Sequence, residues 1–320
     1  MKIGDIELSM PVILAPMAGV SDPPMREMVM SFGAGLTVSE MVPSNSQVIL
    51  EGKRVKSDKL KKLFSPACDC VQIFGNSPDV MAEAARINVG LGAKIIDINM
   101  GCPANKIVGN DCGSALMKNS PLAREIVRAV VKAIKVPVSV KIRTGWNEEN
   151  KNAVEFACML EGEGASAITV HGRTRAQLFG GSVDLGTIAK VKSALKIPVV
   201  GNGDITSPEL ARAMIEATGV DAVMVGRGAM GRPWLLRYIA EYLASGSILP
   251  EPSVAERKQL LLRHAKLMFE YYGDKVGALC MRKHAAWYSY GLPRAAEFRR
   301  KINSSASGAE ELDLVEEYFI

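Results

Sequence analysis

Short apolar runs of strand length recur along the chain from Val12 to Val225, separated by polar or helix-like stretches. They predict eight strands: Val12–Ala15, Leu36–Ser39, Cys70–Phe74, Ile95–Ile98, Val138–Ile142, Ala167–Val170, Val199–Gly201 and Ala222–Val225. Apolar residues at three- and four-residue spacing predict helices between them, several starting at Asn, Ser or Pro: Ser77–Val89, Pro121–Ile134, Asn150–Glu161 and Pro208–Ala217. The charged stretch Lys53–Lys62 is expected to be a loop or a solvated helix.

Alternating strands and helices imply parallel strands joined by crossover helices. Eight repeats favour a closed (β/α)8 TIM barrel, an α/β fold, over an open doubly wound sheet, and no G-x-G-x-x-G motif opens the chain. Beyond the segments Ser245-Gly246-Ser247 and Pro250-Glu251-Pro252 only helical periodicity remains. We therefore expect a barrel over residues 1–245 and a small all-helical C-terminal domain over residues 246–320.

Composition narrows the class of protein. No apolar run reaches the roughly 18 residues that span a bilayer, and the first residues include Lys2, Asp5 and Glu7, so we expect a cytoplasmic protein without membrane contact. Six cysteines without a C-x-x-C pair, and only three histidines, suggest neither a disulfide framework nor a metal site. A net charge of +5 permits a polyanionic partner. We expect a monomer with no obligate protein partner.

Polar or glycine-rich groups follow every predicted strand, at the end where TIM barrels build their sites. They are Pro16-Met17-Ala18-Gly19, Ser39-Glu40-Met41, Gln72, Asn99-Met100-Gly101-Cys102-Pro103, Lys141-Ile142-Arg143, His171-Gly172-Arg173, Asn202-Gly203-Asp204 and Gly226-Arg227-Gly228. Each glycine loop alone could be a plain tight turn, but a pair after strands seven and eight favours phosphate binding. With Gln72, Lys141 and His171 pointing inward, the set suits a planar cofactor such as FMN, although Lys141 alone could be a buried ion-pair lysine and His171 a core histidine.

These motifs resemble the tRNA-dihydrouridine synthase family, closest to its bacterial B-type branch. The resemblance runs from about residue 5 to residue 300, and its most specific segments are Asn99-Met100-Gly101-Cys102-Pro103 and His171-Gly172-Arg173-Thr174-Arg175. It implies an FMN-containing barrel and a helical RNA-binding domain that reduce the C5–C6 double bond of selected uridines in tRNA, with NADPH or NADH as electron donor. By matching position, the resemblance implies that FMN contacts Pro16, Met17, Ala18, Gln72, Lys141, His171, Asn202, Gly203, Asp204, Gly226 and Arg227.

The same resemblance implies that Cys102 is the catalytic acid and that Asn99 lies close to the reacting base. Reducing uracil requires a hydride at C6 and a proton at C5, and a thiol with an ordinary pKa of about 8.5 still holds its proton near pH 7. We therefore expect a neutral acid, not an activated nucleophile. The alternative is a small buried hydrophobic side chain, the usual fate of a free cysteine. Cys112, a second thiol on the same loop, is expected to serve packing or to lie on the surface.

A stacked uridine must be extruded to reach a barrel mouth, so the protein must bind RNA tightly enough to offset that cost. From Arg257 to Lys301 there are eleven Lys or Arg side chains against three acids, a net charge of +8. Cations mixed with aromatic side chains are typical of RNA contacts, although a solvated helix face with Trp287 in the core is the alternative. The expected RNA contacts are Arg282, Lys283, His284 and Trp287 in the tail, and Lys106, Arg143, Arg173 and Arg175 at the barrel rim.

The acidic residues that end the chain, Glu310, Glu311, Asp313, Glu316 and Glu317, would repel RNA, so the last helix is expected to face away from it. Two other functions remain open at this point. One is an FMN barrel that acts on a free pyrimidine such as dihydroorotate, and the other is a non-catalytic RNA-binding protein that retains flavin. Ribosomal RNA as a target also remains open.

Overall fold

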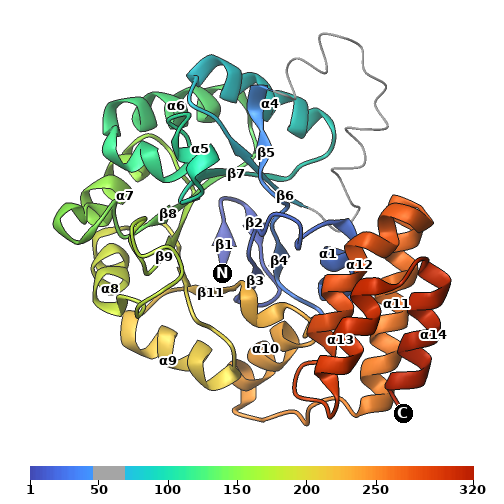
Figure 1. Ribbon diagram of the computed structural model, residues 1–320. Coiled ribbons are helices and arrows are strands. Elements are labelled where there is room, and N and C mark those ends of the chain that lie inside the picture. The colour runs from blue at the N-terminus through green and yellow to red at the C-terminus, as the bar shows by residue number, and fades with distance from the viewer. Residues whose placement is uncertain (46–68) are drawn as a thin grey trace.

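The computed structural model describes residues 1–45 and 69–320, and the stretch Lys53–Lys62 lies outside them. Its main sheet curls into a barrel of parallel strands (Figure 1). In order around the barrel these are β4 Leu36–Thr37, β3 Val12–Leu14, β11 Ala222–Val225, β10 Val199–Asn202, β9 Ala167–His171, β8 Val138–Arg143, β7 Ile95–Met100, β6 Cys70–Phe74 and β5 Val42–Pro43.

The expected second strand is divided in two. β4 pairs with β3, β5 pairs with β6, and a parallel bridge between Val38 and Cys70 joins the two edges of the sheet. β4 and β5 therefore share one of eight positions in the ring. The predicted (β/α)8 barrel is confirmed, with an interruption in its second strand that the apolar run Leu36–Ser39 did not reveal.

Each strand is buried on both faces, as in other parallel sheets, which is why the strands read as continuous apolar runs. In β7, Ile95 points into the barrel and packs with Ile13 and Val200, whereas its neighbour Ile96 packs with the surrounding helices. The helices that form this outer ring are α1 Pro23–Met30, α4 Pro78–Gly90, α6 Ser120–Ala133, α7 Ala153–Gly162, α8 Leu185–Ala194, α9 Pro208–Thr218 and α10 Leu235–Ser245 (Figure 1).

Most helix starts agree with the sequence predictions because their caps are local. Ser207 accepts a hydrogen bond from the backbone N–H of Leu210 and precedes Pro208, the first residue of α9. The helix expected from Asn150 instead begins at Ala153. Asn147 caps a short 3-10 turn, Glu148–Asn150, by accepting from the Asn150 N–H at 3.0 Å, and this turn takes the place of the first helical residues.

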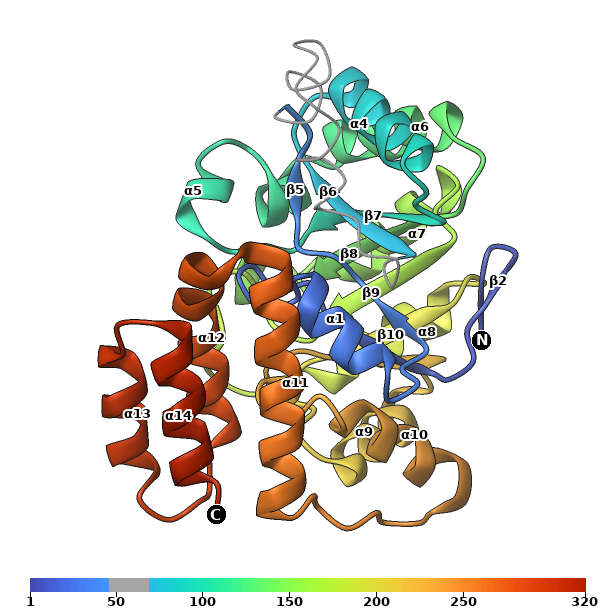
Figure 2. The same cartoon turned by 90° about the vertical axis from the view of Figure 1, so that its right-hand side faces the viewer.

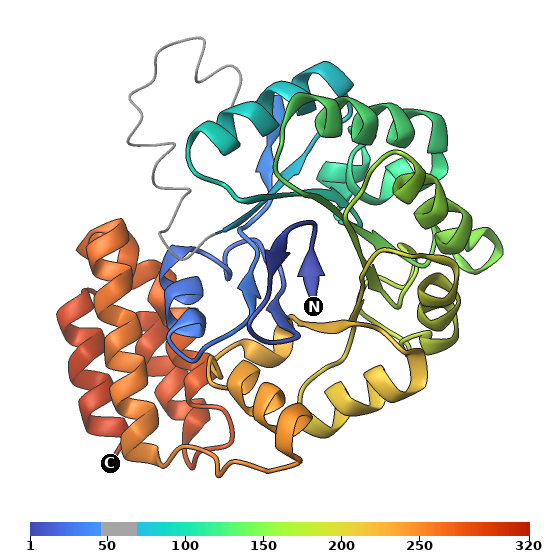
Figure 3. The same ribbon diagram turned by 180° about the vertical axis from the view of Figure 1, so that it is seen from behind.

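An N-terminal hairpin, β1 Lys2–Ile3 and β2 Ile6–Glu7, closes one end of the barrel (Figure 3). Ile3 and Leu8 are buried against Ile95 and Ala222, residues that begin their strands. The hairpin therefore covers the end where the strands start. The hairpin does not cover the opposite end of the barrel, where the carboxyl ends of the strands lie and where a binding site can form.

Four helices, α11 Val254–Tyr272, α12 Asp274–Tyr288, α13 Ala295–Ser304 and α14 Gly308–Tyr318, pack together beside the barrel (Figure 2). α11 lies against α1. Within the described residues, no helix is both long and apolar enough to cross a bilayer.

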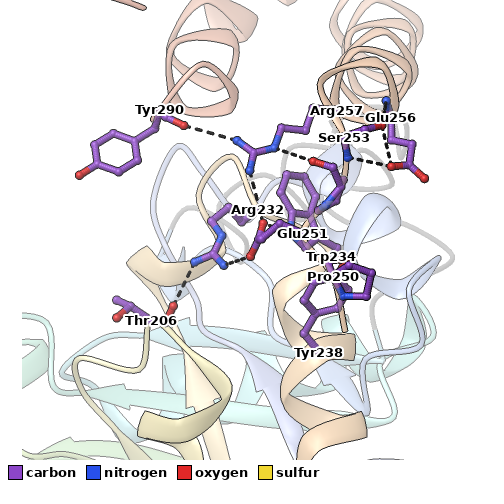
Figure 4. Close-up of polar contacts among 11 residues, drawn as sticks. Thr206, Arg232, Trp234, Tyr238, Pro250, Glu251, Ser253, Glu256, Arg257 and Tyr290 are labelled. Carbon is purple, nitrogen blue, oxygen red and sulfur yellow. Dashed lines mark hydrogen bonds and ion pairs between the residues drawn. The ribbon is translucent and has the colours of Figure 1, made fainter. Parts of the chain in front are cut away.

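Glu251, in the segment between α10 and α11, ties these helices to the barrel (Figure 4). Its carboxylate accepts hydrogen bonds from the guanidinium of Arg232 and, at 3.1 Å, from the indole N–H of Trp234. Arg232 also donates to the Thr206 carbonyl at 3.0 Å, in the loop after β10. Since Trp234 is 1% exposed and belongs to the core of the helical bundle, the barrel and the bundle share buried side chains.

Candidate active site at the carboxyl ends of the strands

A cavity of about 590 Å³ opens at the carboxyl ends of the barrel strands. Such a volume is typical of small-molecule and cofactor sites. The eleven residues expected to contact a cofactor all line it, and so do Asn99 and Cys102. They come from seven of the eight positions in the ring, because the ends of parallel strands converge at one rim.

A chain of hydrogen bonds runs beneath one wall of the cavity. Asp97 accepts from Ser139 Oγ and from Gln72 Nε2, both at 2.6 Å. Gln72 Oε1 accepts from Asn99 Nδ2 at 2.8 Å, and Asn99 Oδ1 accepts from the backbone N–H of Cys102 at 2.9 Å. The buried amides of Gln72 and Asn99 are thus held in fixed orientations at the edge of the cavity.

Cys102 itself is held by its backbone on both sides. Its carbonyl accepts from the Ser114 hydroxyl at 2.9 Å, and the carbonyl of the preceding Gly101 accepts from Arg143 Nε at 2.8 Å. The thiol lies on the cavity wall and is partly exposed. A cysteine in this position can reach a bound molecule, which a purely structural core cysteine cannot.

Cys112 occupies a different environment. Its side chain is buried, its Sγ lies 3.2 Å from the Asn110 carbonyl, and it does not line the cavity. Burial, with the nearby Asp111 carboxylate, raises the pKa of its thiol. The packing role expected for Cys112 agrees with this placement.

Four cations surround His171 on the far wall of the cavity: Lys141, Arg143, Arg173 and Arg227. Burial, reinforced by these charges, lowers the pKa of His171 to about 2, so the imidazole is neutral at physiological pH. Burial and the Arg143 charge lower the pKa of Lys141 to about 8, while Asp97 opposes that shift.

Lys141 Nζ donates to Asn202 Oδ1 at 3.0 Å, and Asp204 forms ion pairs with Arg173 and Arg227. Asp204 is the one carboxylate among the described lining residues, against the four cations. The cavity therefore carries an excess of positive charge suited to an anionic ligand.

Three of the expected RNA contacts lie deeper in the structure than the sequence suggested. His284 is fully buried and packs edge-on against His264 in the helical core, so no direct contact with RNA is open to it. Arg143 and Arg173 are each 2% exposed and line the cavity instead of the outer rim, so their contact with RNA stays a prediction. Arg143 donates to the carbonyls of Thr174 and Leu178, both at 2.8 Å, so it holds the loop after β9 in place.

Two further tail residues have structural partners. Arg282 pairs at 3.2 Å with Glu311, a 3% exposed residue of α14, and also donates to the Ser305 carbonyl. Trp287 is half-buried, and its backbone packs so closely against Gly231 that a Cβ at that glycine would lie 2.4 Å from it. The acids of α14 thus neutralise part of the basic tail, as the Lys258–Glu316 pair also does.

The remaining expected contacts lie near the cavity mouth. Lys106 is exposed on α5 Asn105–Val108, just after Cys102. Arg175 donates to Asn105 at 2.9 Å and lies 4.8 Å from the ring centre of Trp146. Lys283 reaches across from α12, since its Nζ would lie 3.3 Å from a Cβ built on Gly19. These three cations remain candidates for binding a polyanion.

Sequence reasoning missed Asp97 and Phe179. Asp97 was absorbed into an apolar strand, although its spacing of two from Asn99 places both side chains on the same face of β7. Phe179, 54% exposed, lines the cavity between the guanidinium groups of Arg143 and Arg227, at 5.6 and 5.4 Å from its ring centre. An aromatic residue six positions after Arg173 gives no comparable signal in the sequence.

Comparisons with known proteins bear on the family. Residues 13–320 match the model of the family described as dihydrouridine synthase (Dus). The chain is 48% identical over 302 residues to a probable tRNA-dihydrouridine synthase of Rickettsia conorii, covering 94% of this chain and 91% of the relative. It is 46% identical over 319 residues to tRNA-dihydrouridine synthase B of Salmonella typhimurium, covering 100% of this chain and 99% of the relative.

Solved structures share the fold at lower identity. Histamine dehydrogenase from Rhizobium sp. 4-9 matches with a TM-score of 0.58 and 15% identity, over 83% of this chain and 50% of that one. A 2-naphthoyl-CoA reductase matches with a TM-score of 0.59 and 14% identity, over 77% of this chain and 51% of that one. The extent and identity of the sequence matches establish that the chain is an enzyme of the dihydrouridine synthase family.

Proposed function

We propose that the enzyme reduces the C5–C6 double bond of specific uridines in tRNA to 5,6-dihydrouridine, using FMN and NADPH, with Cys102 as the proton donor. The observation that carries this proposal is the position of the Cys102 thiol on the wall of a cationic cavity whose lining also includes Gln72, Asn99 and Lys141. The names of the matched relatives support tRNA as the substrate.

The volume and the cationic lining of the cavity support FMN as its ligand. The FMN phosphate requires cations and close backbone approach, and the wall formed by Asn202, Gly203, Gly226 and Arg227 offers both. A Cβ on Gly226 would stand 3.8 Å from the side chains of Ala15 and Met17, which also line the cavity. The polar edge of the flavin ring suits Gln72 and Lys141, and Pro16, Met17 and Ala18 offer apolar contact.

FMN held by these residues would supply the hydride that C6 of the uracil requires, with NADPH as the electron donor. Cys102 holds the proton that C5 receives, and Asn99 orients the base beside it. Lys141 places a positive charge where negative charge accumulates on the flavin. Neutral His171 adds a hydrogen-bonding group without adding a fifth cation.

The tRNA contact is proposed for residues 246–320 together with the cavity mouth. Lys106, Arg175 and Lys283 neutralise phosphates around the extruded uridine. Deleting the helical bundle is a poor test of this contact, because Trp234 of the barrel is buried in the bundle core. Point substitutions on the surface are the better choice. A cytoplasmic location and a monomeric state remain predictions.

The test of the proposed function is dihydrouridine formation on unmodified tRNA with NADPH, measured by mass spectrometry of RNA digests. Wild type and Cys112→Ala should form the product, and Cys102→Ala should form at least about 100-fold less in the same time. If wild type leaves tRNA unmodified but turns over dihydroorotate, the free-pyrimidine alternative is correct. If wild type binds flavin and tRNA but forms no product, the protein is a non-catalytic RNA binder. Ribosomal RNA fragments in the same assay test the other target.

A further inference from the structure

Asp97 lies in the barrel interior, one layer below the cavity. It pairs in register with Gln72 of β6 on one side and with Ser139 of β8 on the other, whereas Asn99 pairs with Lys141 in the next layer toward the mouth. Asp97 is 2% exposed and does not line the cavity. Its carboxylate therefore cannot touch a bound ligand directly, yet it contacts a residue that does.

The direction of the hydrogen bonds above Asp97 follows from chemistry alone. The backbone N–H of Cys102 can only donate, so the atom of Asn99 facing it at 2.9 Å must be the amide oxygen. The Asn99 NH₂ group then faces Gln72 and requires the Gln72 oxygen. The Gln72 NH₂ group consequently faces Asp97, which must accept. Each amide has only one orientation that satisfies the whole chain.

A carboxylate is the group best suited to fix that direction. Both oxygens of an ionised Asp are acceptors, whereas an amide can rotate and exchange its acceptor oxygen with its donor NH₂ group. The choice has a cost, since burial raises the pKa of Asp97 to about 6 despite the bonds from Gln72 and Ser139. A buried charge retained against its desolvation cost is better explained by a requirement for orientation than by packing, which an apolar residue would serve equally well.

We propose that Asp97 is a positioning residue for the reduction: through Gln72 and Asn99, its carboxylate fixes where Cys102 lies on the cavity wall. This inference rests on the proposed role of Cys102. Asp97 also supports the charge of Lys141, which it favours electrostatically from below. One buried carboxylate thus acts on both the proposed acid and the proposed cation of the site.

The first test compares Asp97→Leu and Asp97→Asn with Ser139→Ala in the flavin-loaded enzyme. Leucine has no acceptor, so the Gln72 NH₂ group loses its partner and the chain up to Cys102 is no longer anchored from below. We expect kcat to fall about 100-fold, the scale of a 1 Å misplacement, with the KM for tRNA nearly unchanged. Asparagine can still accept from Gln72 if its NH₂ group faces Ser139, so its kcat should fall by only about tenfold. Ser139→Ala removes the other partner of Asp97 and should stay within about threefold of wild type.

The second test reads the position of Cys102 without turnover. Alkylation by iodoacetamide is followed site by site with mass spectrometry, and the exposed Cys158 serves as an internal reference. We expect the Cys102 rate to rise at least about threefold in Asp97→Leu, because its loop is less restrained, while the Cys158 rate is unchanged. The flavin content, read from visible absorption, should remain that of wild type.

A reciprocal swap provides the rescue. In the double variant Asp97→Asn with Gln72→Glu, the new carboxylate at position 72 accepts from Asn99 and from the new amide at position 97, so the defect of Gln72→Glu alone is relieved. The Cys102 alkylation rate should return to that of wild type. Gln72→Glu alone places two carboxylates face to face, and its Cys102 alkylation rate should be higher than that of wild type and of the double variant.

Wild-type alkylation and kcat in Asp97→Leu would overturn the proposal. So would a swap that fails to restore the alkylation rate, or a loss in Ser139→Ala as large as that in Asp97→Leu, which would indicate a purely structural role. Failure of the proposed function is separate from these results. Full activity of Cys102→Ala would show that Cys102 is not the proton donor. The alkylation rates of the Asp97 variants would still show whether Asp97 positions Cys102, because they do not depend on turnover.

Discussion

Lys141 Nζ donates to Asn202 Oδ1 at 3.0 Å, across the barrel interior between two strands that are not neighbours. β9 separates β8 from β10, and its last residue, His171, is kept neutral by burial and by the surrounding cations. This bond holds the half-buried Lys141 ammonium ion beside the cavity that the proposed cofactor would occupy. The protonation state of Lys141 should therefore control cofactor binding.

We expect FMN affinity to depend on the charge of Lys141. Burial lowers its pKa to about 8, so the ammonium ion is present below that pH and is lost as the pH rises through it. Titration of flavin-stripped protein with FMN should give nearly constant affinity around pH 7, where the FMN phosphate is dianionic, and a fall of up to about tenfold per pH unit above pH 8, since one proton is lost. Lys141→Met should bind weakly at every pH without this dependence, and Lys106→Met, on the surface, should behave as wild type. A profile unchanged in Lys141→Met would contradict this role.

Asp97 should cost stability at neutral pH. Its folded-state pKa of about 6 exceeds the ordinary 3.8, so the folded state binds more protons than the unfolded state between these values. Stability must therefore fall as the pH rises from 4 to 6. Replacing the carboxyl removes this fall, so the stability of Asp97→Asn relative to wild type should improve over that window by on the order of 3 kcal/mol.

Thermal denaturation of both proteins at a series of pH values checks this difference. Glu163→Gln provides a contrast of opposite sign, because its hydrogen bond from Arg128 lowers the pKa of Glu163. That carboxylate stabilises the fold above its ordinary pKa of 4.5. The stability of Glu163→Gln relative to wild type should therefore fall as the pH rises. If the stability of Asp97→Asn and of wild type changed in parallel with pH, burial would not raise the pKa of Asp97.

Of the cations expected to contact RNA, Lys106 should affect tRNA binding and Arg282 should affect stability. Lys106 is exposed beside the Cys102 loop, so Lys106→Ala should raise the KM for tRNA severalfold, leave kcat unchanged and reduce the salt dependence by about one phosphate contact. Arg282 is bound to buried Glu311, so Arg282→Ala should instead lower the melting temperature, because it leaves that carboxylate unpaired. Kinetics at two salt concentrations and a melting curve distinguish these effects. Equal effects on KM from both variants would refute the assignment.

The positions of the strands could be predicted from the sequence where both faces of the strand are buried. β6 to β11 are covered on both faces and read as apolar runs, so their positions were predictable to within two residues, and the convergence of their ends brought Gln72, Lys141 and Asn202 to one cavity. The two-residue strands of the N-terminal hairpin are too short for any periodicity, and the interruption between β4 and β5 depends on Val38 meeting Cys70, a contact between distant residues.

The tail was harder to interpret for a different reason. A run of cations and aromatic residues does not reveal which face of a helix is buried, and His284 and Arg282 proved to face the bundle interior and α14. Asp97 was overlooked because a single charge inside an apolar strand changes the hydrophobic pattern very little. Its partners, Gln72 and Ser139, come from two other strands, and only the register of the barrel brings them together.

The central claim is that Cys102 donates the proton that completes uracil reduction. The most direct measurement is a single turnover, in which the reduced enzyme is mixed with unmodified tRNA in a stopped-flow instrument and flavin oxidation is followed. Wild type and Cys112→Ala should oxidise at the same rate, and Cys102→Ala should be slower by about 10² or more, the usual contribution of a positioned general acid. Equal rates for Cys102→Ala and wild type, with dihydrouridine formed by both, would contradict the account.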